Sequence, residues 1–99
     1  MRSEPIAVIA EDEPLLREGL ADALAQLWPE LSIAGVAGDG VEALRLLGLH
    51  RPNVLFLDIE MPGLNGIEVA RQAAGRAHVV FVTAYDRYAL AAFDEGAVD

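Results

Sequence analysis

Hydrophobic residues occur along this chain in short uninterrupted runs, separated by longer amphipathic stretches. The runs have the length and apolar character of buried strands, and they span residues 5–10, 31–37, 53–57 and 78–82. Apolar residues at helical spacing predict helices over residues 14–28, 39–50, 65–74 and 87–95. Continuously apolar strands that alternate with helices are typical of a parallel sheet covered on both faces. We therefore expect a doubly wound α/β fold with right-handed connections.

Residues that begin and end helices stand at the borders of these stretches. Pro14 suits a first helical turn and Pro29 helps to end the first helix, which carries four leucines on one face: Leu16, Leu20, Leu24 and Leu27. Asp39, with Glu42 three residues later, resembles a capping box, and Asn65 is the expected cap of the third helix. The 99 residues contain no repeat, low-complexity tract or linker, which predicts one domain.

Composition narrows the classes of function. The formal net charge is −9, from 16 acidic and 7 basic residues, so direct binding to polyanionic DNA is not expected. No apolar run is long enough to cross a bilayer, and the start of the chain lacks the features of a signal peptide. The absence of cysteine excludes a disulfide framework and a thiolate zinc site. A cytoplasmic protein without membrane association is the expectation.

Acidic residues follow two of the predicted strands directly. Glu11, Asp12 and Glu13 come after the first strand, and Asp58 comes after the third. Ligands of open α/β sheets bind beyond the carboxyl ends of the strands. These carboxylates are therefore predicted to lie on one rim of the sheet.

An all-oxygen cluster of this kind favours a hard divalent cation, and Mg²⁺ commonly uses one or two carboxylates with water and phosphate oxygens. The competing interpretation is an acidic helix start that merely complements the helix dipole, worth about 0.3–1 kcal/mol per charge. Asp58 is either a nucleophile that forms an acyl phosphate or an ordinary turn residue. Thr83, after the fourth strand, offers a hydroxyl to a phosphoryl oxygen or simply ends that strand.

Three motifs in order resemble the receiver domains of bacterial response regulators: EDEPL at 11–15, DIEMPGLNG at 58–66 and TAYD at 83–86. The resemblance covers residues 1–99, and the segment 85–99 is most similar to the LytTR-type subfamily, in which a C-terminal domain binds promoter DNA. It implies a flavodoxin-like sheet with strand order 2-1-3-4. It also implies a sensor histidine kinase as phosphodonor, with the domain catalysing its own phosphorylation and slow dephosphorylation.

The resemblance also implies a role for each matching residue in a Mg²⁺-dependent site. Asp58 matches the phosphoacceptor, Asp12 the main metal carboxylate and Glu11 the acidic position before it, where many members have Asp. Glu60 matches the position whose backbone carbonyl completes the metal shell.

Thr83 matches the hydroxyl that responds to phosphorylation, and Ala84 the small residue that leaves access to the site. Relatives continue past the position of Asp99 into a fifth strand, a phosphate-pairing lysine and a fifth helix, and this sequence contains no lysine. We therefore expect a truncated receiver domain without its output domain. Loss of the covering elements predicts impaired switching and self-association, for example as a dimer.

Other functions remain open at this point. The main alternative is a protein–protein interaction module of the same fold that works independently of phosphorylation. A haloacid-dehalogenase-like phosphatase is a poor match, because its acid/base Asp would stand where Glu60 is. No Gly-rich nucleotide fingerprint occurs. His50 and His78 are interpreted as structural, and the aromatic residues Tyr85, Tyr88 and Phe93 either form an output surface or pack.

Overall fold

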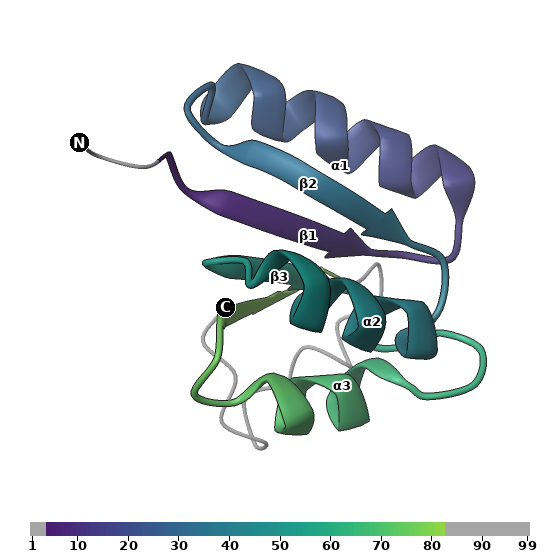
Figure 1. Cartoon of the computed structure of the whole chain (residues 1–99). Helices are drawn as coiled ribbons and strands as arrows, with labels where there is room; N and C mark the ends of the chain where they lie inside the picture. Colours follow the sequence, from purple (N-terminus) through teal and green to yellow (C-terminus); the bar gives the residue numbers. More distant parts are fainter. Residues whose placement is uncertain (1–3, 83–99) are drawn as a thin grey trace.

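The computed structural model of the chain describes residues 4–82, which form a parallel sheet with helices on both faces (Figure 1). The elements, in chain order, are β1 (Ile6–Ala10), α1 (Pro14–Leu27), β2 (Ser32–Ala37), α2 (Gly40–His50), β3 (Val54–Leu57), α3 (Gly66–Ala73) and β4 (His78–Phe81). The predicted strands and the first three predicted helices are confirmed, and the helix predicted over 87–95 lies outside the described residues. No helix within 4–82 has the length and apolar character needed to cross a membrane.

The sheet has the strand order β2-β1-β3-β4, with every neighbouring pair parallel. This confirms the expected order. β1 lies in the interior of the sheet and pairs with β2 on one side and β3 on the other. Because Ala10 pairs with Leu57, the carboxyl ends of β1 and β3 lie next to each other.

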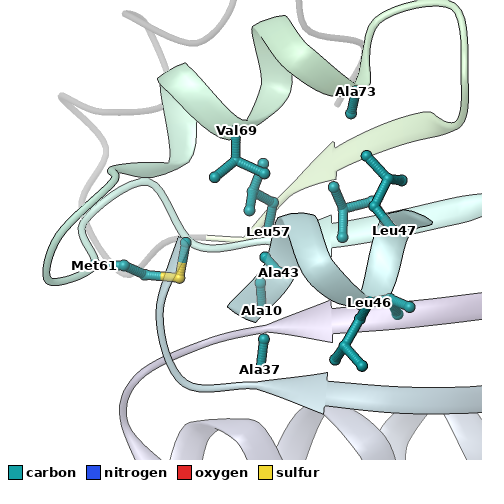
Figure 2. Close-up of a cluster of buried hydrophobic side chains, with 11 residues drawn as sticks. Ala10, Ala37, Ala43, Leu46, Leu47, Leu57, Met61, Val69 and Ala73 are labelled. Carbon is teal, nitrogen blue, oxygen red and sulfur yellow. The ribbon is translucent and has the colours of Figure 1, made fainter. Parts of the chain in front are cut away.

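Alternate residues of β1 enter two separate cores. Val8 and Ala10 pack with buried residues of α2 and α3, whereas Ala7 and Ile9 belong to the core beneath α1. Figure 2 shows the first of these cores, in which side chains of both helices point at the sheet: Ala43, Leu46, Leu47, Val69 and Ala73. The centre of the sheet is thus buried on both faces, which explains why β1 and β3 are apolar throughout.

Side chains cap all three helices at their starts. Asp39 Oδ1 accepts a hydrogen bond from Glu42 N at 2.8 Å, and Asn65 Oδ1 accepts one from Glu68 N at 3.0 Å. Both caps were predicted. The Glu42 carboxylate binds Arg45 instead of completing a capping box, with contacts of 2.9 and 2.6 Å. Glu13 caps α1 through a 3.2 Å bond from Leu15 N, which the sequence analysis did not predict.

The covered face of α1 is narrower than its leucine pattern indicates. Leu20 and Leu24 pack against the core, whereas Leu16 and Leu27 are 55% and 83% exposed. Ala21 also packs against the core. On a helical wheel at 100° per residue, Leu20, Leu24 and Ala21 form one stripe, and Leu16 and Leu27 lie at the edge of this stripe that is farther from Ala21. The helix is therefore rotated so that the stripe formed by Leu20, Leu24 and Ala21 faces the sheet.

Candidate functional site

Backbone hydrogen bonds fix the directions in which the chain leaves β1 and β3. Glu11 N donates to Ala37 O at 2.9 Å, so the residue after β1 is still held to β2. Asp58 N donates to Ala10 O at 2.9 Å, which holds the residue after β3 to the end of β1. These backbone bonds alone place Glu11 and Asp58 at one rim of the sheet.

Three carboxylates come together at this rim. One oxygen from each of Glu11, Asp12 and Asp58 lies within 4.8 Å of the other two. Glu11 is buried, with 6% of its surface exposed, Asp58 is half-buried and Asp12 is exposed. The cluster is therefore open to solvent on the Asp12 side and closed behind Glu11.

Burial and mutual repulsion change the acidity of two of these groups. Desolvation raises the pKa of Glu11 to about 7, with Asp58 and Asp12 adding repulsion and the bond from Glu13 N opposing it. Desolvation also raises the pKa of Asp58, with repulsion from Asp12 contributing and the bond from Glu60 N acting in the opposite direction. A cation at the rim would remove the repulsion between these groups.

The hydrogen bonds to the clustered carboxylates leave the solvent-exposed side of the cluster, at Asp12, open. Glu11 Oε2 accepts from Glu13 N at 3.0 Å, and Asp58 Oδ1 accepts from Glu60 N at a longer 3.4 Å. Arg17 Nη1 donates to the carbonyl oxygen of Glu11 at 3.0 Å, so its charge lies next to the cluster. Sequence reasoning missed Arg17, although an arginine one turn into the helix after an acidic run is a usable signal.

The loop after Asp58 is held by close packing. Ile59 and Met61 are buried, and Gly66 N donates to Ile59 O at 2.7 Å. A side chain at Gly66 would collide with the Asp58 carbonyl and would lie 2.6 Å from Ile59 Cα. The close approach of α3 thus fixes the backbone of the aspartate, which the sequence did not indicate.

The donor set fits a hard divalent cation. All three groups offer carboxylate oxygens within reach of a single ion, and the described residues place no nitrogen or sulfur ligand in the cluster. Glu11, Asp12 and Asp58 could hold Mg²⁺ in this arrangement. Glu60 is exposed, and the role of its carbonyl stays a prediction. Thr83 and Ala84 lie outside the described residues.

The two histidines lie away from this rim. His50 is half-buried at the end of α2, and His78 is exposed at the start of β4. Both are at the opposite end of the sheet from the carboxylates, so neither belongs to the cluster.

A family model described as the response regulator receiver domain matches residues 7–99. An uncharacterized response regulatory protein from Vibrio cholerae is 51% identical over 94% of this chain and 37% of its own length. The transcriptional regulatory protein BtsR from Salmonella typhi is 43% identical over 93% of this chain and 39% of its own length. The chain thus spans well under half the length of these curated relatives.

Solved structures agree with this match. The receiver domain of AraT, a response regulator from Geobacillus stearothermophilus, has a TM-score of 0.85 and 32% identity, covering 97% of this chain and 78% of that one. The response regulator domain of Thermotoga maritima CheB has a TM-score of 0.83 and 30% identity, covering 96% and 75% of the two chains.

Proposed function

The chain belongs to the response regulator receiver domain family, and on this basis we propose that it accepts a phosphoryl group on Asp58 in a two-component phosphorelay. The observation that carries the proposal is the position of Asp58, half-buried at the carboxyl end of β3 with Glu11 and Asp12 beside it. Relatives named as a response regulatory protein and a transcriptional regulatory protein support the wider role.

The proposed step is a displacement at phosphorus. A carboxylate oxygen of Asp58 bonds to the phosphorus of a phosphohistidine, the P–N bond breaks, and the electron pair leaves with the imidazole nitrogen. Mg²⁺, when bound, offsets the negative charge that gathers between the carboxylates and the phosphoryl oxygens. Glu11 and Asp12 would hold that ion, with the Glu60 carbonyl as a further ligand.

The surrounding protein prepares Asp58 for this reaction. The bond from Asp58 N to Ala10 O and the close contact with Gly66 hold the backbone of Asp58 in place, so little reorganisation is needed. We propose that Thr83 donates its hydroxyl to a phosphoryl oxygen and that Ala84 leaves room for the donor. Both roles rest on the family motif.

The partners follow from the same proposal. A sensor histidine kinase would supply the phosphoryl group, and an output domain would bind DNA. The resemblance of segment 85–99 favours an output domain of LytTR type. The receiver itself carries a net charge of −9, which disfavours direct DNA binding. Self-association of this chain stays a prediction, and a monodisperse monomer by light scattering at tens of micromolar would contradict it.

Intact-mass measurement tests the phosphoacceptor. Incubation with acetyl phosphate or phosphoramidate and Mg²⁺ is expected to add one phosphoryl group, and Asp58→Asn is expected to abolish the gain. Asp22→Asn, which changes an exposed aspartate on α1, is the matched control and should be modified like the parent. Absence of any adduct on folded parent protein would instead favour a phosphorylation-independent interaction module.

A further inference from the structure

A concavity lies at the end of the sheet opposite Asp58. It has a volume of about 480 Å³ and lies between the connection from α2 to β3 and the connection from α3 to β4. Its lining residues are Arg51, Pro52, Asn53, Gly75, Arg76, Ala77 and His78. The concavity is open to solvent, and none of the clustered carboxylates lines it.

The charge of this concavity is opposite to that of the whole chain. The sequence has 7 basic and 16 acidic residues, yet Arg51 and Arg76 line the concavity together with His78, and no acidic residue among residues 4–82 does. Within residues 4–82, Arg45 is paired with Glu42, whereas neither Arg51 nor Arg76 has an ion-pair partner. Two guanidinium groups thus keep their donors available at one place.

The backbone beneath these arginines is well fixed. Pro52 is fully buried. Asn53 N donates to Ile6 O, and Ile6 N donates to Asn53 Oδ1, each at 2.7 Å. His78 N donates to Asn53 O at 2.9 Å, which joins the two connections. A ligand here would meet a fixed backbone, and ordering the two exposed arginine side chains would be the main conformational cost of binding.

Arg51 has an unusual backbone conformation, and Arg76 extends toward α2. Arg51 ends α2 in the left-handed region, with φ 48°, directly before a proline, although glycine is the usual residue at such an end. The Arg76 guanidinium reaches across to α2, where a Cβ on Gly48 would lie 4.0 Å from its Nη2. Backbone strain retained at a charged residue is a reason to look for a function of that side chain.

The helix dipoles oppose anion binding here, but they are the weaker contribution. α2 and α3 both end beside the concavity, and each carboxyl end corresponds to roughly half a negative charge. Two guanidinium groups together outweigh both ends and leave roughly one net positive charge. Guanidinium forks pair with oxyanions in bidentate fashion, which favours phosphate and carboxylate groups over halides.

We propose that this concavity is a binding site for a small oxyanion with at least two negative charges, held mainly by Arg51 and Arg76. The ligand chemistry is that of a phosphate ester or a polycarboxylate. The site lies on the far end of the sheet from Asp58 and does not depend on phosphorylation.

Amide chemical shifts report binding at this place directly. The ¹⁵N-labelled chain, in buffer freed of metal on a chelating resin, is titrated separately with pyrophosphate, citrate and acetate. We expect saturable shifts at Asn53, Arg76 and His78 with pyrophosphate or citrate, and much weaker ones with singly charged acetate. The tighter of the two polyvalent anions identifies the class of ligand.

Three variants separate this site from a general charge effect. Arg51→Asn, which tolerates the left-handed backbone, and Arg76→Gln should each weaken binding about tenfold or more. Arg45→Gln removes the same charge elsewhere on α2 and should leave the affinity unchanged. Asp58→Asn should also bind normally, because the rim is not involved.

Several results would overturn the proposal. These are a lack of saturation with both polyvalent anions at tens of millimolar, shifts confined to the carboxylate rim, or equal weakening by Arg45→Gln. Because Arg51 and Arg76 are tested in separate variants, misfolding of one leaves the other informative.

Discussion

Among the acidic side chains of the rim, Glu11 stands out by its burial. Asp12 has the same formal charge one residue later but is exposed, so desolvation acts on Glu11 and raises its pKa to about 7. Because the raised value lies near neutral pH, protonation of Glu11 competes with any cation that needs its carboxylate. Metal binding and pH are therefore coupled at this residue.

The first prediction concerns the stability of the metal-free protein. The pKa of folded Glu11 lies above its ordinary value of 4.5, so the folded state holds the proton more tightly between 4.5 and about 7. Its contribution to stability is full below pH 4.5 and is lost as the pH rises through about 7. Glu11 should thereby lower the free energy of unfolding over this interval by at most about 3–4 kcal/mol, at about 1.4 kcal/mol per pH unit.

Urea unfolding at half-unit pH steps with EDTA measures this dependence. Glu11→Gln should flatten it, apart from the part due to Asp58, whose pKa is also raised. An identical slope in Glu11→Gln and the parent would show that Glu11 does not titrate in this range.

A second prediction at this scale concerns Gly66. Gly66→Ala would push a methyl group against the backbone of Asp58 and Ile59, so we expect destabilisation by about 1–3 kcal/mol and slower phosphorylation. Gly19→Ala is the control, because nothing lies within 4 Å of a Cβ there and the helix should gain about 0.5–1 kcal/mol. The urea midpoints and phosphorylation rates of both variants test this prediction. An unchanged midpoint in Gly66→Ala would contradict the close approach of α3 to Asp58.

Among the elements, α1 shows how tertiary packing selects part of a helical face. Its leucines share one side by periodicity, yet only Leu20 and Leu24 contact the core. The strands behave differently, since Val8, Ile9, Leu55 and Leu57 are fully buried as their runs predicted. A strand between two helical layers has no exposed face to choose, whereas a helix on the outside does.

The third prediction follows from this asymmetry. Leu24→Ala should cost about 1–2 kcal/mol of unfolding free energy, because its half-buried side chain packs against buried strand residues. Leu27→Ala changes the same residue type on the same helix but at an exposed position, and its effect should stay within about 0.5 kcal/mol. Equal costs in chemical denaturation would show that the face of α1 is assigned wrongly.

Across the whole molecule, the doubly wound sheet separates two kinds of charge. Carboxylates gather where β1 and β3 end, and arginines gather where β3 and β4 begin. Ions of opposite sign are therefore expected to bind at opposite ends.

The fourth prediction is that Mg²⁺ stabilises the folded chain. At pH 8, a concentration one hundred times the dissociation constant should raise the free energy of unfolding by about 2.7 kcal/mol. Asp12→Asn should remove most of this gain, while Asp22→Asn, the control on α1, should keep it. Thermal melts with and without Mg²⁺ measure the effect, and an equal gain in Asp12→Asn would argue against the rim as the binding place.

The sequence by itself determined the order of strands and helices, the caps at Asp39 and Asn65, and the placement of Asp12 and Asp58 at strand ends. These features depend on local periodicity and on residues next to one another in the chain. Strand order followed from the family resemblance, and the structure agrees with it.

Only the tertiary structure decided how deeply Glu11 is buried, which leucines of α1 meet the core and why Gly66 has no room for a side chain. It also brought Arg51 and Arg76 to one concavity from separate connections. Each of these depends on segments far apart in sequence that pack together, and burial, desolvation and close backbone approach arise from such packing.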